Sequence, residues 1–227
     1  MDTPETYVPL TAEELPSRLC HLAALTSRLG NHSDQWHVEE IGDGNLNLVF
    51  VVRGESGAVI VKQALPYIRL VGDSWPLPLS RAFFEYHALI RQSNRDPHSV
   101  PEVLHFEENQ ALIVMEFLDQ HVILRSLLIG GKRVNNLGLR LGKFIARNAF
   151  RGSDLALPII DRKADTKLFL DNHALCNITE SLVFTDPYFD AELNHHNAVI
   201  DGVVAGLRGN ITLKTEAQVL LTKFVAN

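Results

Sequence analysis

The sequence predicts an α+β protein in which a largely antiparallel sheet comes first and helices follow. Two observations support this fold class. Residues 36–118 contain short apolar runs, several of them alternating with other residues, that turn residues separate, as in strands. Beyond Leu118, apolar residues recur at three- and four-residue spacing, as in amphipathic helices. The chain has 227 residues, 46% of them hydrophobic and 21% charged, which is typical of a folded protein and excludes a disordered or fibrous one.

The first elements are a helix and three strands. Thr11 and Glu14 form a capping-box pattern before spaced leucines, so residues 10–30 are predicted to be helical, with Pro16 splitting off a short turn from the main helix. Strands are then expected on both sides of the turn at 42–45. A further turn at 53–57 leads to 58–64, which has the β-branched density of a buried strand.

The next segment is predicted as a loop, a helix and a hairpin. Three prolines, at 66, 76 and 78, are expected to break regular structure. Ser80 is expected to cap a long helix whose apolar residues are Phe83, Tyr86, Leu89 and Ile90. A hairpin of 103–106 and 111–115 then completes a five-stranded sheet. We therefore expect a first lobe over 1–118.

The remaining residues, 119–227, are predicted as a mainly helical second part, and the boundary falls between 116 and 119. One helical face comprises Leu137, Leu141, Phe144, Ile145 and Asn148, and another comprises Ala217, Leu220, Leu221 and Phe224.

Composition excludes several classes of partner. The net charge is −6, from 21 basic and 27 acidic residues, so no nucleic-acid partner is expected. No apolar run approaches the roughly 18 residues that span a bilayer, and no basic region opens the chain, so we expect a soluble protein without a membrane partner. Cys20 and Cys176 lie far apart in the sequence, which fits a reducing cytoplasm.

The turn at 42–45 is the first candidate for chemistry. Gly42 and Gly44 lack side chains, so backbone N–H groups there can approach a phosphate. A plain hairpin turn explains the same residues. A Rossmann motif is excluded because a strand follows the turn, and neither Gly131-Lys132 nor Gly142-Lys143 completes a Walker A motif.

Three later features fall in the order of a kinase nucleotide-binding lobe. Lys62 ends a buried apolar strand and requires an anion, for which Glu85 on the following helix is the natural candidate. Glu116, Phe117 and Leu118 end the fifth strand, where an inter-lobe hinge would hydrogen-bond adenine. A surface lysine and an ordinary strand end are the alternatives for these features. Taken together, their order favours a kinase-like nucleotide site.

Four runs carry a resemblance to a known family: 41–47 (IGDGNLN), 61–67 (VKQALPY), 71–77 (VGDSWPL) and 182–189 (LVFTDPYF). They closely resemble bacterial 5-methylthioribose kinase, among the small-molecule kinases similar to choline kinase and aminoglycoside phosphotransferases. The resemblance implies transfer of the γ-phosphate of ATP, with Mg²⁺, to the 1-hydroxyl of 5-methylthioribose in methionine salvage. It also implies that the full-length members of the family work as homodimers.

The resemblance implies roles for individual residues. Asn47, Lys62 and the backbone of Glu116, Phe117 and Leu118 match the family's ATP contacts, and Glu85 matches the partner of the lysine. The remaining members of the implied site are Gly42, Gly44 and Asn45 in the phosphate-facing turn and Asp73 and Trp75 in a loop near the substrate.

The family's catalytic H-G-D-x-H loop and its metal-binding D-x-E segment are expected after this region, and the loop does not occur before Asn227. Asp190-Ala-Glu192 fits the second pattern, but we interpret it as a polar helix start. We therefore expect a fragment whose catalytic residues and Mg²⁺ ligands lie outside this chain and which is inactive alone. The alternatives are an inactive nucleotide-binding or dimerisation module and another small-molecule kinase of the same fold.

Overall fold

The computed structural model describes residues 4, 6–41, 44–69, 72–191 and 194–226. The chain has two compact units, Met1–Asp171 and Asn172–Asn227. The lobe boundary expected between 116 and 119 stays a prediction. The first compact unit extends past it to Asp171 and includes both the sheet and the helices that follow the sheet.

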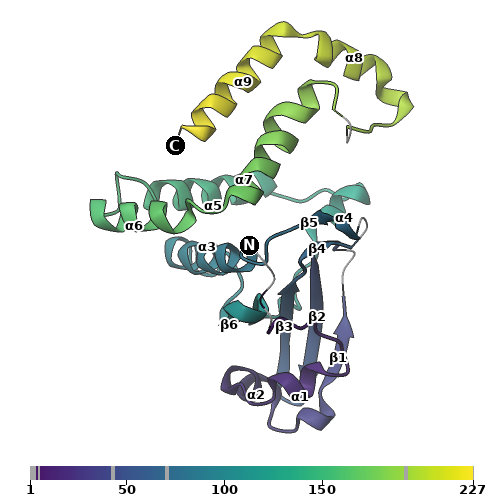
Figure 1. Cartoon of the computed structure of the whole chain (residues 1–227), viewed down its shortest axis with the longest axis vertical. Helices are drawn as coiled ribbons and strands as arrows, with labels where there is room; N and C mark the ends of the chain where they lie inside the picture. The colour runs from purple at the N-terminus through teal and green to yellow at the C-terminus, as the bar shows by residue number, and fades with distance from the viewer. Residues whose placement is uncertain (1–3, 5, 42–43, 70–71, 192–193, 227) are drawn as a thin grey trace. The chain divides into compact units, whose positions relative to one another are not determined.

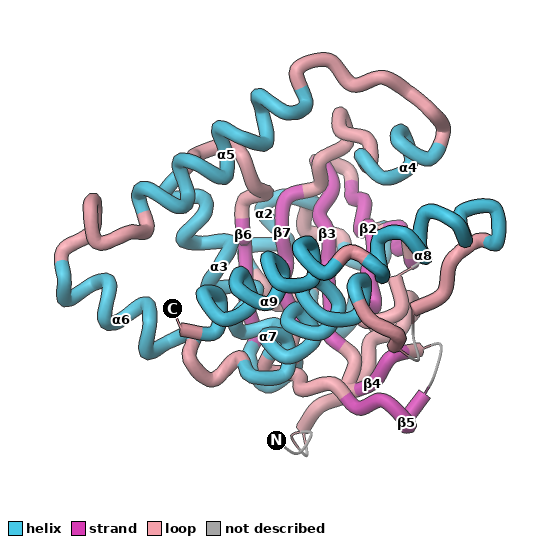
Figure 2. Tube along the Cα trace, turned by 90° about the horizontal axis from the view of Figure 1, so that it is seen from above, coloured by secondary structure: helices cyan, strands magenta, loops and turns pink. Residues whose placement is uncertain are grey.

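The first unit is built on a five-stranded antiparallel sheet, which confirms the predicted α+β class. Its strands are β1 (His37–Glu40), β2 (Asn47–Gly54), β3 (Gly57–Ala64), β6 (Val103–Glu107) and β7 (Leu112–Glu116). They lie in the order β1-β2-β3-β7-β6, so β3 is the central strand, and Figure 2 shows β2, β3, β7 and β6 side by side. The hairpin of β6 and β7 completes the sheet as the sequence predicted.

A second, two-stranded sheet was not predicted. β4 (Tyr67–Ile68) pairs with β5 (Gly72–Pro76) in the segment where three prolines were expected to prevent regular structure. Pro76 ends β5 and lies opposite Tyr67 in a sheet of only two strands. A proline is tolerated there because an edge strand has one side that needs no N–H donor.

The N-terminal helical prediction was right in type and wrong in its break point. The segment forms α1 (Leu15–Leu19) and α2 (Ala23–Leu29), and the helix breaks after Leu19 rather than near Pro16. Pro16 lies in the first turn of α1, where backbone N–H groups have no helical partner and a proline costs little. The Thr11 hydroxyl accepts from the Glu14 amide at 3.2 Å, as the predicted capping pattern requires. The helix begins later than expected, however: the N-cap residue of α1 is Glu14, whose side chain makes no capping hydrogen bond.

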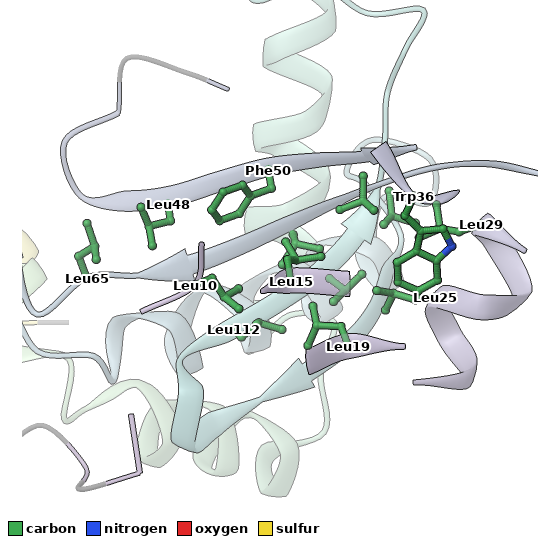
Figure 3. Packing of buried hydrophobic residues seen from close by; sticks show 14 residues of the cluster. Leu10, Leu15, Leu19, Leu25, Leu29, Trp36, Leu48, Phe50, Leu65 and Leu112 are labelled. Atoms are coloured by element: carbon green, nitrogen blue, oxygen red, sulfur yellow. The ribbon is translucent and has the colours of Figure 1, made fainter. Parts of the chain in front are cut away.

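The core lies between these helices and the sheet. Every second residue of β3 faces the helices, and Val59 and Val61 on that face are fully buried. Figure 3 shows Phe50 and Trp36 with leucines of the N-terminal segment in the same cluster. Its other labelled members are Leu10, Leu15, Leu19, Leu25, Leu29, Leu48, Leu65 and Leu112.

Helix α3 (Arg81–Arg95) follows β5 and departs from its predicted details. Ser80 occupies the N-cap position, but its side chain accepts no capping hydrogen bond. The buried residues are Arg81, Ala82 and Phe84, whereas the predicted apolar face at 83, 86, 89 and 90 is only partly buried. Tyr86 of that face stacks on Phe106 of β6 with the ring centroids 4.4 Å apart.

Three more helices complete the first unit: α4 (Leu124–Ile129), α5 (Leu137–Arg151) and α6 (Ile159–Phe169). α5 confirms the helix predicted from Leu137 to Asn148, but its apolar face is not buried, since Leu141 and Ile145 are exposed. The second unit contains α7 (His173–Thr179), a π-helical segment Glu180–Thr185, α8 (Asp201–Gly209) and α9 (Ile211–Val225). α9 confirms the last predicted helix. Among the described helices, none is both long and apolar enough to cross a membrane.

Candidate functional site

An ion pair between β3 and α3 lies at the centre of the candidate site. Lys62 is paired with Val49 of β2 and Ile113 of β7, so strands lie on both sides of it. The alternation of β3 directs it to the face opposite Val61. Its Nζ atom lies 2.5 Å from Oε1 of Glu85, and the two side chains are 23% and 35% exposed. The pairing that the sequence predicted for Lys62 is therefore present.

A second cation, Arg81, lies one helical turn before Glu85 and is 7% exposed. Its guanidinium donates to the carbonyl oxygen of Leu65 at 2.7 Å, to that of Leu46, and to Oδ1 of Asn47 at 3.4 Å. Burial lowers the pKa of Arg81, and the nearby Tyr7 and Glu85 partly oppose that shift. Arg81 therefore connects the start of α3 to the start of β2 by hydrogen bonds.

Sequence reasoning missed Arg81. A basic residue in the first turn of a helix is unfavourable to the helix dipole, and Arg81 stands four residues before Glu85, on the same face. These two signals indicate that Arg81 interacts with groups outside its own helix. The partners themselves are backbone carbonyls, which leave no pattern in the sequence.

The turn before β2 is described in part. Gly42 lies outside the described residues. Gly44 is exposed, and a Cβ atom built on it would meet no atom within 4 Å. The carbonyl oxygen of Asn45 accepts from the Arg69 amide at 2.7 Å, which ties the turn to the segment after β3. Open space around Gly44 agrees with a plain hairpin and with a turn that faces a phosphate.

The predicted hinge residues follow one another at the end of β7. Glu116 is opposite Val59 of β3, and its amide donates to the carbonyl oxygen of Glu102 at 2.8 Å. The guanidinium of Arg53 lies 4.8 Å from the ring centroid of Phe117, and Leu118 is 37% exposed. Glu116 and Leu118 also line a cavity of about 460 Å³, together with His121 and residues of the loop after α3.

The other candidates are placed as follows. Asp73 and Trp75 lie on β5, in the segment that joins β3 to α3. Within the described residues, no group of three or more His, Cys, Asp or Glu side chains is arranged to hold a metal ion. Of the proposed nucleotide residues, the structure therefore joins Lys62 with Glu85 directly, and joins Asn47 to the same helix through Arg81.

No family model matches the chain. Curated proteins of similar sequence, however, provide a comparison. It is 40% identical over 231 residues to a methylthioribose kinase of Escherichia coli O45:K1, covering 96% of this chain and 55% of that protein. It is 41% identical over 223 residues to a methylthioribose kinase of Geobacillus kaustophilus (96% and 54%) and 38% identical over 221 residues to methylthioribose kinase 1 of Oryza sativa subsp. japonica (96% and 51%).

The chain spans about half the length of the curated relatives that it matches. The matched region covers nearly the whole chain, including the turn at 42–45, Lys62, Glu85 and the end of β7. The resemblance of this chain to the methylthioribose kinase family, which its motifs predicted, is thus confirmed over 96% of its residues.

Proposed function

We propose that this chain forms the nucleotide-binding part of an ATP-dependent kinase that converts 5-methylthioribose to its 1-phosphate in methionine salvage. The observation that carries the proposal is the 2.5 Å ion pair between Lys62 and Glu85. A lysine held on a central strand by a helix glutamate is the arrangement with which kinases bind nucleotide phosphates. The relatives named methylthioribose kinase support the choice of substrate.

In this proposal each residue has a definite task. Lys62 neutralises phosphate oxygens, and Glu85 fixes the direction of its side chain. The turn that includes Gly44 and Asn45, with Gly42 before it, presents N–H groups to the phosphates, and Asn47 at the start of β2 presents its side-chain amide. The backbone at Glu116, Phe117 and Leu118 receives the adenine ring. Asp73 and Trp75, which were expected in a loop and lie on β5, would approach the sugar substrate.

The described residues do not fit a Mg²⁺ site. Kinases hold Mg²⁺ on phosphate oxygens through carboxylates or amides, and the described residues offer no cluster that fits this task. We therefore assign no step through Mg²⁺ to the residues of this chain. We also propose that the full-length protein forms a homodimer, which light scattering would test, and that it works in a reducing cytoplasmic compartment.

Calorimetry with a non-hydrolysable ATP analogue and Mg²⁺ tests the nucleotide site. Lys62→Ala should weaken binding about 10- to 100-fold, because a charge-assisted hydrogen bond is worth roughly 1.5 to 3 kcal/mol. Lys132→Ala is the matched control, since Lys132 is an exposed lysine in the turn after α4. Equal affinities of the two variants, both folded by circular dichroism, would refute the site.

A coupled ADP-release assay on the same chain distinguishes the candidate functions. Turnover with 5-methylthioribose and not with choline or an aminoglycoside would support the proposed reaction. Turnover with another acceptor would identify a different small-molecule kinase. Nucleotide binding without turnover is the result expected of a chain whose catalytic residues lie elsewhere. The same result together with a stable dimer of this chain would favour a binding or dimerisation module.

A further inference from the structure

We propose that Asp165, on α6, is a positioning residue that holds Glu85 against Lys62 by fixing the far half of α3. This inference rests on the proposed nucleotide site. It concerns a carboxylate that contacts neither member of the ion pair and lies 80 residues after Glu85 in the sequence.

The contacts of Asp165 are directed at one helix. Its Oδ1 accepts from Nε of Arg91 at 2.6 Å, and its Oδ2 accepts from Nη2 of Arg95 at 2.9 Å. The carboxylate is 19% exposed and each arginine 22% exposed, so these bonds are only partly screened by water. Both arginines belong to α3 and stand one turn apart, so a single carboxylate binds two successive turns of that helix. Figure 1 shows the ribbons of α3 and α6 next to each other.

Aromatic contacts reinforce the same junction. The guanidinium of Arg91 lies 5.2 Å from the ring centroid of Phe169, at the end of α6. That ring is also 6.2 Å from the ring of Phe84 on α3. Asp165 and Phe169 are one helical turn apart, so one face of α6 contacts α3 through charge and through ring packing.

α3 depends on this junction because its buried anchors are all at its beginning. Of its fifteen residues, all of them described, the buried ones are Arg81, Ala82 and Phe84. Arg91 and Arg95 stand six and ten residues after Glu85, about 9 and 15 Å along the helix axis. Glu85 therefore lies between an anchor at Arg81 and an anchor at Asp165. A tilt of the far half of the helix would move its carboxylate relative to Lys62.

Other bonds hold the end of α3 as well, and they limit the expected effect. Arg147 of α5 donates to Asp96 at 2.7 Å, and Arg151 donates to the carbonyl oxygen of Arg95. Loss of Asp165 alone is thus expected to loosen the helix without releasing it. We expect a several-fold effect on nucleotide affinity rather than its abolition.

A double-mutant cycle tests the proposal through a readout that a merely structural role would not give. The 227-residue chain is titrated calorimetrically with the ATP analogue as wild type, Asp165→Asn, Glu85→Gln and the double variant. Asp165→Asn should weaken binding about 3- to 10-fold in the wild-type background, which is typical coupling between residues of one network. It should have no further effect once Glu85→Gln has removed the ion pair.

The control is Asp154→Asn, because that carboxylate contacts Arg162 of α6 at 3.6 Å and is 78% exposed. It should leave affinity unchanged. Should Asp165→Asn melt below the assay temperature, Arg91→Gln replaces it in the cycle, since Arg95 still holds Asp165. Asp165→Glu keeps the charge and should restore part of the affinity.

Each outcome has one meaning. Independent, multiplying effects of Asp165→Asn and Glu85→Gln would overturn the proposal, as would unchanged affinity in folded Asp165→Asn. If Glu85→Gln alone left affinity unchanged, the proposed nucleotide site would fail instead, and the cycle would show this in its first arm.

Discussion

The hydroxyl of Tyr7 donates a hydrogen bond of 2.8 Å to the carbonyl oxygen of Ala64, the last residue of β3. Tyr7 packs with Ala64, Ala82 and Ala111, so the N-terminal segment reaches the end of the strand that carries Lys62. Burial raises the pKa of Tyr7 to about 12. The segment before α1 is therefore part of the fold that supports the candidate site.

Tyr7→Phe should lower the free energy of unfolding by about 0.5 to 1.5 kcal/mol at pH 8, the usual net value of one hydrogen bond. The unfolded phenol ionises near pH 10, whereas the folded one stays neutral up to about 12. Wild-type stability should therefore fall between these pH values, and its advantage over the variant should shrink. Urea unfolding at pH 8, 10 and 11.5 measures the difference in unfolding free energy between wild type and variant. The other tyrosines titrate in both proteins, so their contribution cancels from that difference.

Gln63 also binds the N-terminal segment, and its side chain lies on the face of β3 opposite that of Ala64. Its side chain is 0% exposed, accepts from the Leu10 amide at 2.7 Å, and donates to the carbonyl oxygens of Val8 at 3.0 Å and Gln110 at 3.1 Å. One buried amide thus binds two backbone groups of the N-terminal segment and one about 100 residues later in the sequence. Such a network is costly when one member is removed.

Gln63→Leu should reduce the free energy of unfolding by about 2 to 3 kcal/mol, since three buried or partly buried backbone groups lose a partner. The variant has nearly the same side-chain volume, so lost packing contributes little. Gln35→Leu, at an exposed position, is the control and should change stability by no more than about 0.5 kcal/mol. A loss at Gln63 no greater than that of the control would contradict the account.

The fold was predictable wherever its signal was local. Alternation and β-branched residues indicated β2, β3 and the β6–β7 hairpin, and three- and four-residue spacing indicated α5 and α9. The β4–β5 sheet was not predictable from alternation, because β4 has only two residues. The break between α1 and α2 was misplaced because Pro16 has the same sequence signature whether it starts a helix or interrupts one.

The candidate site was predictable only in part, for a similar reason. Lys62 and Glu85 were identified because a charge at the end of an apolar strand requires a partner nearby in the chain order. Arg81 binds backbone carbonyls, and Asp165 binds Arg91 across 74 residues of sequence, so neither contact has a local signature. Side-chain contacts of this kind follow from how the helices pack, which spacing does not specify.

Two glycines should respond oppositely to alanine. A Cβ atom on Gly54, where β2 ends, would lie 2.1 Å from the carbonyl oxygen of Leu29 at the end of α2. Backbone would have to move, so Gly54→Ala should cost roughly 1 to 3 kcal/mol. Gly138 lies within α5 with no atom within 4 Å of the corresponding position, and Gly138→Ala should gain about 0.5 to 1 kcal/mol from helix propensity. Thermal unfolding of both variants compares them directly, and an increase in Tm for Gly54→Ala would show that the close approach is absent.

Asp96, at the C-terminal end of α3, should contribute to the loss of stability of the first unit at acid pH. The residue is 5% exposed, and its carboxylate accepts from the Ser99 hydroxyl at 2.8 Å and from Arg147 at 2.7 Å. The Ser99 hydrogen bond, together with the bond and charge of Arg147, lowers the pKa of Asp96 below its usual range. The stabilisation is therefore complete above the unfolded pKa, near 3.9, and is lost as pH falls through the lower folded pKa.

Asp96→Asn should accordingly destabilise the protein most at neutral pH, because the uncharged amide gives up the ion pair with Arg147. As pH falls below about 4, wild type loses the same interaction by protonation, so the two unfolding free energies should converge. Urea titrations from pH 7 to pH 2.5 measure the gap. Asp119→Asn, at an exposed position outside the helices and strands, is the control and should follow wild type throughout. A gap for Asp96→Asn that stayed constant over this range would mean that Asp96 takes no part in the acid response, because a group without a shifted pKa cannot make stability depend on pH.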